Sequence, residues 1–192
     1  MAGLIIAGIL GVVFLAWLIG TYNGLVRLRT HVRESWSGID TELQRRYALI
    51  PNLVEVCKGY AAHEQTVFTQ VTRARALAVA ESGGVAPQAQ REDALTGSLR
   101  SLLAVGEAYP ELRASEHFLA LQQELANTED RLQAARRFYN ANVRDLNTRV
   151  QQVPSNLVAS AFGFRSAEYF QLQTASARGP VPVRLDPARP PN

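Results

Sequence analysis

The sequence predicts an all-α protein in which one N-terminal transmembrane helix is followed by an elongated antiparallel bundle of long helices. Three observations predict this fold. Residues 1–20 contain no charged side chain. Beyond them, apolar residues recur at alternating steps of three and four, which is the period of a helix buried along one face. No Asn-Gly turn lies between alternating apolar runs, so a β-hairpin signal is missing from the sequence.

Residues 1–22 form the predicted transmembrane anchor. Twenty helical residues extend about 30 Å, which matches the thickness of a bilayer interior. A cleaved secretory signal is the alternative, but no Lys or Arg precedes the apolar run and no Ala-x-Ala motif follows it. Trp17 and Tyr22 lie near the C-terminal end of the run, where aromatic rings favour the membrane interface. The lipid bilayer is therefore an expected partner.

Arginines predict the orientation of the chain in the membrane. Arg27, Arg29 and Arg33 follow the span within 15 residues, whereas only the α-amino group precedes it. Under the positive-inside rule, the N-terminus should lie outside and the bulk of this single-pass chain should lie in the cytoplasm.

Residues 25–78 carry an apolar stripe that predicts a long helix, and turn signals at residues 82–87 end it. Pro51 lies inside this stripe, although an interior proline costs roughly 3 kcal/mol or more. The stripe keeps its phase across Pro51, so we expect a kinked but continuous helix in which Asn52 hydrogen-bonds a freed backbone group. The kink would redirect residues 52–80. The alternative is a break that places Pro51 at the first position of a second helix.

Three further helices are expected after this one. They cover residues 88–108, 116–153 and a short stretch that begins at Ser155 or Asn156 and ends near Phe162. The aromatic segment "FGFRSAEYF" should pack back on the bundle as a hydrophobic clasp. Long helices with one apolar stripe each can bury those stripes by packing antiparallel.

The chain therefore divides into three parts. The anchor covers residues 1–22, and a helical bundle domain covers residues 23–172. Residues 173–192 hold five of the nine prolines and few large apolar side chains, so we expect a disordered Pro-rich tail.

Asparagines and prolines are the most informative polar and backbone signals. Asn140 and Asn147 lie seven residues apart on one helix face, where they are either exposed to solvent or hydrogen-bonded across a helix interface to fix its register. The similar stretches "IPNLV" and "VPSNLV" suggest turn or kink chemistry at one end of the bundle. The candidate structural and interaction residues are Trp36, Pro51, Asn52, Asn140, Asn147, Pro154 and Asn156.

Motifs of enzymes and metal sites are missing from the sequence. The three histidines lie far apart, and "AAHEQTVF" has no second histidine four residues on, so the HExxH zinc motif is absent. No G-x-S-x-G elbow, phosphate-binding glycine loop or Glu-x-x-His pair occurs. We therefore expect no catalytic, metal-binding or cofactor-binding residue and no enzymatic activity.

Charge and cysteine content exclude two further classes. The net charge is +3, and Arg and Glu alternate along most of the chain, so we expect no nucleic-acid partner. Cys57 is the single cysteine, which excludes an intrachain disulfide and indicates a buried, inert thiol.

The sequence resembles the LemA family of bacterial membrane-anchored proteins. The resemblance is carried by the N-terminal span followed by "YNGLVRLRTHVRESWSGIDTELQRRYALIPNLVEVCKGYAAHE", by "YPELRASEHFLALQQELANTEDRLQAARRFYNANVRDLNTRVQQVPSNLVASAFGF" and by "AEYF". It covers residues 1–172, although residues 80–105 match only in character. It implies one transmembrane helix, a bundle of long helices and the bacterial inner membrane, with no chemistry. It also implies relatives linked to membrane remodelling in magnetosome-forming bacteria and genes that neighbour membrane proteases.

The sequence is compatible with two main functions. The first is a membrane-anchored structural or scaffold protein that self-associates, as a homo-oligomer, or holds partners through its long helical surfaces, for example in membrane organisation. The second is an accessory subunit of a membrane protease or transporter, which makes another membrane protein a possible partner. An enzyme is a third class, and it would require a buried polar cluster with perturbed ionisation.

Overall fold

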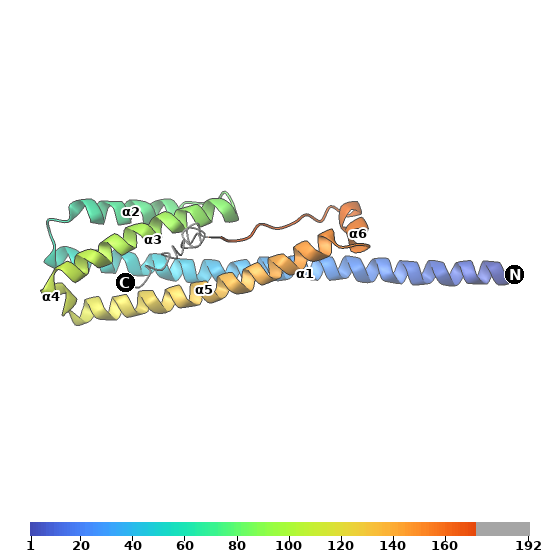
Figure 1. Cartoon of the computed structure of the whole chain (residues 1–192), viewed down its shortest axis with the longest axis horizontal. Coiled ribbons are helices and arrows are strands. Elements are labelled where there is room, and N and C mark those ends of the chain that lie inside the picture. The colour runs from blue at the N-terminus through green and yellow to red at the C-terminus, as the bar shows by residue number, and fades with distance from the viewer. Residues whose placement is uncertain (172–192) are drawn as a thin grey trace, which may run out of the picture.

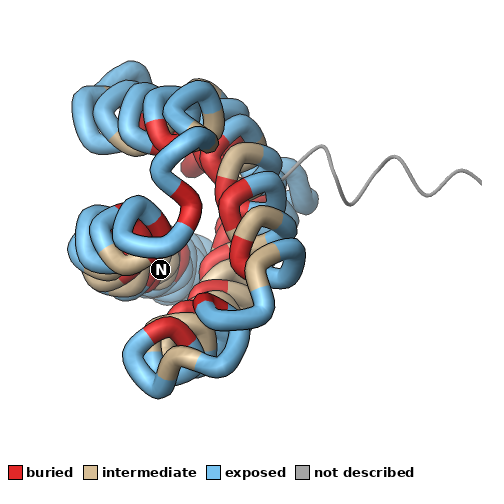
Figure 2. Tube along the Cα trace, turned by 90° about the vertical axis from the view of Figure 1, so that its left-hand side faces the viewer, coloured by how far each residue is buried: buried red, intermediate tan, exposed pale blue. Residues whose placement is uncertain are grey.

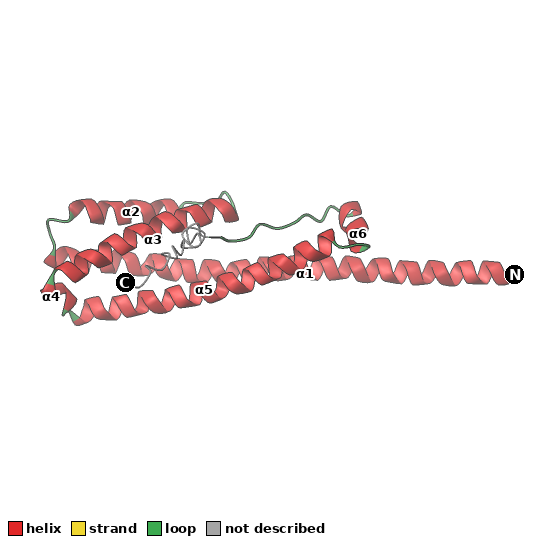
Figure 3. Cartoon of the chain, viewed as in Figure 1, coloured by secondary structure: helices red, strands yellow, loops and turns green. Residues whose placement is uncertain are grey.

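The computed structural model describes residues 1–171 and consists of helices joined by short turns (Figure 3). The helices are α1 (Ala2–Tyr60), α2 (Gln65–Val79), α3 (Val85–Ala108), α4 (Pro110–Arg113), α5 (Glu116–Gln151) and α6 (Ser155–Ala161). No strand occurs within residues 1–171, which confirms the predicted all-α fold. The predicted tail, residues 173–192, lies outside the described residues.

The helices form an elongated bundle around α1, which is its long axis (Figure 1). α5 lies antiparallel along α1, and the antiparallel pair of α2 and α3 packs beside the half of α1 that is farther from the N-terminus. We call this far end, where α4 joins α3 to α5, the α4 end. α6 lies at the opposite end of α5, and we call this the α6 end. The N-terminal part of α1 extends beyond the α6 end.

α1 is one continuous helix across Pro51, as predicted, and the alternative of a break there is wrong. Its 59 residues extend about 88 Å at 1.5 Å per residue. The N-terminal part of α1 is apolar and long enough to cross a membrane, and no residue in its most apolar 18-residue window is buried within the protein.

The prediction that this helix continues to residue 78 is wrong. α1 ends at Tyr60, and the chain reverses through residues 61–64, where the Glu64 amide donates to the Ala61 carbonyl at 3.1 Å. The apolar spacing continues because Ala61 and Phe68 are buried in the same core, although they belong to different segments. Since α2 turns back along α1, the expected redirection of residues 52–80 by a kink at Pro51 is wrong as well.

Buried residues lie along the inner faces of the helices (Figure 2). Their side chains form two clusters. The larger cluster fills the bundle from its middle to the α4 end and includes Ile39, Leu53, Phe68, Leu102, Leu112, Phe118 and Leu132. The smaller cluster lies at the α6 end and consists of Leu25, Leu146, Val158, Ala159 and Phe164. The smaller cluster ties α6 and the residues after it to the part of α1 that follows the predicted span.

A glycine of α3 makes room for an aromatic side chain of α5. The ring of Phe118 occupies the space that a Cβ atom on Gly106 would need, whereas nothing lies within 4 Å of a Cβ atom on Gly97 of the same helix. Gly106 is therefore required by packing, and Gly97 is not.

We expect Gly106→Ala to lower the free energy of unfolding by about 1–3 kcal/mol, because overpacking a core costs that much. The matched control, Gly97→Ala, should raise it by up to about 1 kcal/mol through helix propensity alone. Denaturant unfolding of the full chain in mild detergent measures both changes. A stabilising effect of Gly106→Ala would contradict the packing of Phe118 against α3.

Candidate functional site

Pro51 connects α1 to α2 through the backbone carbonyl that it leaves unpaired. In a regular helix the amide of residue 51 would donate to the carbonyl of Tyr47, four residues earlier, but proline has no amide hydrogen. Arg75 of α2 fills this gap, since its Nε donates to the Tyr47 carbonyl oxygen at 2.7 Å. The proline thus creates an acceptor on the α1 surface that α2 recognises.

The predicted role of Asn52 is wrong. Asn52 is exposed, and the donor to the freed carbonyl is Arg75 instead. The sequence contained a signal for Arg75, because it occupies an apolar-stripe position between Val71 and Ala78, which are both buried.

Asn140 and Asn147 both hold an extended segment of the chain against α5. The Asn147 side chain donates to the Ala167 carbonyl at 2.9 Å and accepts from the Ala167 amide at 2.8 Å. Asn140 makes the same pair of bonds with Phe170, at 3.1 Å and 2.9 Å. Their partner is therefore the backbone of an extended segment, neither solvent nor another helix. We call residues 163–171 the clasp.

The spacing of the two asparagines matches the spacing of their partners. Seven helical residues from Asn140 to Asn147 rise about 10.5 Å. Three extended residues from Ala167 to Phe170 rise about 10 Å, at 3.3 Å each. The order of the pairs is reversed, so the clasp runs antiparallel to α5. The seven-residue repeat of Asn thus fixes the register of a strand-like segment on a helix.

Trp36 packs the clasp onto α1. Its ring lies edge-to-face with Phe170 at 5.5 Å between centroids and with Tyr139 at 5.4 Å. The Tyr139 hydroxyl donates to the carbonyl of Glu168 at 2.9 Å. Phe170 is completely buried, so the expected hydrophobic clasp is anchored by an aromatic cluster that joins α1, α5 and the clasp.

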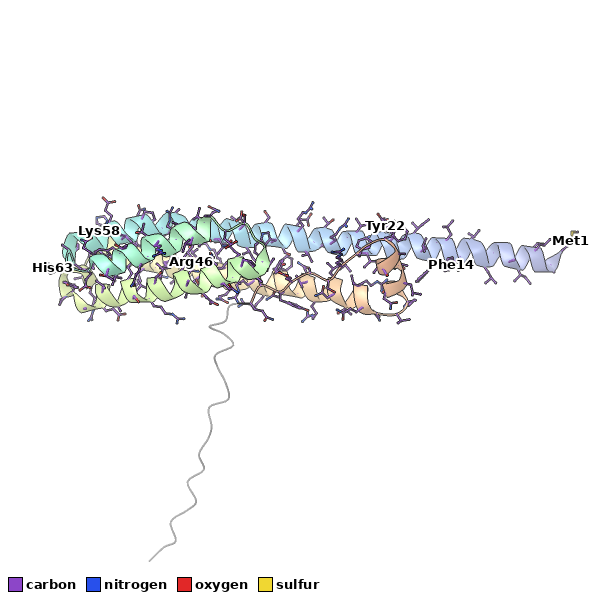
Figure 4. All side chains as sticks on the ribbon, turned by 90° about the horizontal axis from the view of Figure 1, so that it is seen from above. Met1, Phe14, Tyr22, Arg46, Lys58 and His63 are labelled. Carbon is purple, nitrogen blue, oxygen red and sulfur yellow. The ribbon has the colours of Figure 1, made fainter. Side chains whose placement is uncertain are left out.

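A buried polar cluster links α1, α3 and α5 near the middle of the larger core, and the sequence analysis did not single it out. Arg46 contacts the Glu92 carboxylate at 3.2 Å and the Glu129 carboxylate at 3.6 Å, and it donates to the Thr96 hydroxyl at 2.8 Å. The Tyr47 hydroxyl donates to the other Glu92 oxygen. Arg46 and Glu92 are 2% and 0% exposed, so neither charge is solvated by bulk water. Figure 4 shows Arg46 within the bundle.

Gln88 completes this cluster from α3. Its side-chain amide lies 3.0 Å from the Tyr47 hydroxyl and 3.0 Å from Glu92 Oε1, and 3.3 Å from the Ala78 carbonyl. Gln88 and Glu92 lie seven and three residues before Leu95 of the α3 stripe, so their inward direction follows from helical spacing. Helical phase was the signal that could have identified them.

Burial controls the ionisation of the cluster. Burial is the main reason that the pKa of Tyr47 is raised well above its ordinary value, and the neighbouring Glu92 carboxylate adds to the shift. Burial also raises the pKa of Glu92, although the hydrogen bond from Tyr47 and the charge of Arg46 oppose that effect. Tyr47 therefore stays protonated and serves as a donor. Removing one partner of such a buried ion pair typically costs about 3–5 kcal/mol, so the cluster specifies how the three helices meet.

Pro154 and Asn156 lie at the opposite end of the bundle from Pro51 and Asn52, so the expected placement of both proline motifs at one end is wrong. Pro154 lines an apolar groove beside Trp17 and Leu18, at the α6 end. Pro154 ends the turn between α5 and α6 as the N-cap of α6, and its carbonyl accepts from the Leu157 amide at 3.2 Å. Asn156 is half-buried.

Cys57 and the acidic residues show no further arrangement typical of a reactive site. Cys57 is fully buried, and burial raises the pKa of its thiol to about 11. Within residues 1–171, no group of three His, Cys, Asp or Glu side chains could hold a metal ion. The site residues described above join helices to one another and hold the clasp on the bundle.

Comparisons with known proteins give one family match and several relatives, one of which bears the family's name. The model of the LemA family matches residues 35–184. The chain is 29% identical over 206 residues to "Magnetosome protein MamQ 2" of Paramagnetospirillum magneticum, covering 94% of this chain and 75% of that protein. It is 26% identical over 197 residues to "Magnetosome protein MamQ" of Magnetospirillum gryphiswaldense, covering 90% and 71%. It is also 26% identical over 157 residues to "Protein LemA" of Metamycoplasma hominis, covering 80% and 70%.

A double-mutant cycle tests the role of Pro51. We expect Arg75→Ala to lower the free energy of unfolding by about 1–3 kcal/mol, because the buried Tyr47 carbonyl loses its donor. In a Pro51→Ala background the new amide can donate to that carbonyl, so the same change should cost at least about 1 kcal/mol less.

Denaturant unfolding of the full chain in mild detergent measures the cycle. Arg73→Ala is the matched control, since Arg73 is an exposed arginine on the same helix, and it should change stability by less than about 0.5 kcal/mol. Equal costs of Arg75→Ala in both backgrounds would show that Arg75 does not compensate for the proline.

Proposed function

The chain belongs to the LemA family, and we propose that it acts as a membrane-anchored scaffold of the bacterial inner membrane that self-associates or holds partners through its long helical surfaces. Its family and the apolar N-terminal part of α1 indicate a membrane-associated helical protein. The magnetosome proteins among its relatives support a role in membrane organisation.

The observation that carries this proposal is the continuity of α1. One helix contains both the apolar stretch and the axis of the bundle, with no linker between them. A helix of this kind transmits the position and tilt of the anchor directly to the bundle. A chain that only needed tethering to a membrane would work equally well with a flexible linker.

The polar cluster supports a structural role over catalysis. Glu92 is 0% exposed and Tyr47 is 3% exposed, and their hydrogen-bonding groups face other side chains of the cluster. A catalytic group must reach a substrate, whereas these groups are enclosed between helices. We therefore propose that the buried cluster maintains helix packing and that the chain performs no reaction.

The orientation follows from the charges beyond the span. Arg27, Arg29 and Arg33 favour the cytoplasmic side, which would place the bundle in the cytoplasm and the N-terminus outside. A scaffold in this orientation presents its surfaces to cytoplasmic or membrane partners.

Phe138 is the strongest candidate for a contact with a second copy. Its side chain is 64% exposed on α5, in the part of the bundle that lies beyond the predicted membrane region. Its neighbour Arg137 is also exposed. Large exposed aromatic side chains are enriched at binding surfaces.

Affinity purification in mild detergent, followed by mass measurement of the complex, tests the proposal. A homo-oligomer supports the scaffold, and a stoichiometric foreign membrane protease or transporter subunit would instead assign the accessory role. We expect Phe138→Ser to weaken self-association by about tenfold or more, as loss of a hot-spot aromatic does, because it removes an exposed apolar contact. Arg137→Ser is the matched control, with an expected change of less than about threefold. A monomeric chain without partners would contradict the proposal.

A further inference from the structure

Exposed apolar side chains gather around α6, outside the predicted anchor. Val153, Leu157 and Phe162 are 73%, 67% and 53% exposed, although they lie within ten residues of one another. Leu157 lies within the seven-residue α6, Val153 precedes it and Phe162 follows it as the C-cap. Large apolar side chains exposed close together mark a surface that contacts a partner or a membrane.

The position of α6 along α1 gives its depth in the membrane. Phe162 stacks edge-to-face on Tyr22 at 4.9 Å between centroids. Leu157 and Phe162 also line an open, wholly apolar groove of about 400 Å³, whose other wall includes Phe14 and Trp17. Figure 4 shows that Phe14 and Tyr22 lie on the stretch of α1 where the bundle begins. α6 therefore lies beside the last turns of the membrane-spanning stretch.

The distances agree with insertion at the membrane interface. Phe14 lies eight residues before Tyr22, the end of the predicted span, and eight helical residues rise about 12 Å. A helix that lies in the interface buries its apolar face about 5–10 Å below the headgroup boundary. Because α1 and α6 are packed together, the depth of α6 is tied to the depth of α1.

The charges around this end of the molecule match an anionic lipid surface. No Asp or Glu occurs in residues 1–33 or 146–167. The charged side chains in these two ranges are Arg27, Arg29, Arg33, Arg149 and Arg165. The guanidinium of Arg29 lies 5.0 Å from the centroid of the Phe164 ring, so basic groups follow directly after the apolar surface. Basic residues next to a membrane surface attract anionic headgroups.

Two polar groups at the ends of α6 are paired inside the protein, whereas Asn156 Oδ1 is buried without a hydrogen-bond partner among residues 1–171. Ser155 is 3% exposed, and its hydroxyl lies 2.7 Å from the Arg149 carbonyl and 2.9 Å from the Gln152 carbonyl. The Phe164 amide donates to the Ala159 carbonyl at 2.9 Å at the other end of α6. These bonds reduce the cost of placing the short helix where little water is available.

We propose that α6, with Val153 and Phe162 at its ends, inserts into the interfacial layer of the same bilayer that α1 spans, so that lipid acyl chains cover its apolar face and fill the groove. This second membrane contact rests on the proposed anchor. It fixes the rotation and tilt of α1, because a single helix can rotate in a bilayer whereas a helix with a lateral inserted element cannot.

Quenching of a fluorophore on α6 tests this inference in the full chain. A Cys57→Ala background carries Leu157→Cys, labelled with an environment-sensitive fluorophore, in vesicles of phosphatidylcholine and phosphatidylglycerol. The quenchers are a lipid with a nitroxide on its acyl chain and iodide present on both sides of the membrane. Leu10→Cys, within the span, and Leu119→Cys, an exposed apolar position of α5 at the α4 end, are the matched controls.

We expect the nitroxide lipid to quench the label at position 157 as it quenches position 10, and iodide quenching to be at least about fivefold weaker than at position 119. If iodide quenches position 157 as strongly as position 119, while position 10 is quenched by the nitroxide lipid and not by iodide, the inference is wrong but the anchor stands. Iodide quenching at position 10 would overturn the anchor and the inference together. Protection of position 157 from both quenchers would show that protein covers α6, and the lipid assignment would be wrong.

Discussion

The whole structure depends on α1 remaining one helix from its apolar N-terminal stretch to Tyr60, across a proline. Pro51 removes one backbone hydrogen bond from this helix, and Arg75 of α2 supplies a donor to the carbonyl that is left. The compensation also places α2, because only a helix that lies beside Pro51 can reach that carbonyl. The costly residue in α1 thus serves as the attachment point for the next helix.

Two other sets of paired polar groups fix how the remaining segments pack. Apolar packing alone would permit these segments to slide along one another. The cluster of Arg46, Tyr47 and Glu92 fixes α3 and α5 near the centre, because a shift of one helical turn would leave buried charges unpaired. Asn140 and Asn147 fix the clasp on α5 by reciprocal backbone hydrogen bonds. Apolar stripes pack helices together, and these polar pairs select one register among the possible ones.

Helical periodicity predicted most of the fold, because each long helix buries one apolar stripe. It predicted continuity across Pro51 correctly, since phase is kept there. It failed at residues 61–64, because the stripe stays in phase across a turn that contains neither Gly nor Pro. The polar cluster was missed for a related reason: Arg46 and Glu92 occupy stripe positions, but charged residues on long helices are usually solvated. Asn140 and Asn147 were identified from spacing, whereas their partner could not be, because an extended segment leaves no periodic signal.

The central claim is that the anchor and the bundle form one rigid body through α1, which is what would allow a scaffold to set distances and directions at a membrane. The most direct measurement is the distance between spin labels at Ile5→Cys in the anchor and Thr41→Cys in the bundle, in a Cys57→Ala background and in lipid vesicles. These exposed positions lie ten helical turns apart on one face, so we predict a narrow distribution centred near 54 Å. A broad distribution, or one centred at a clearly shorter distance, would show a joint within α1 and contradict the claim.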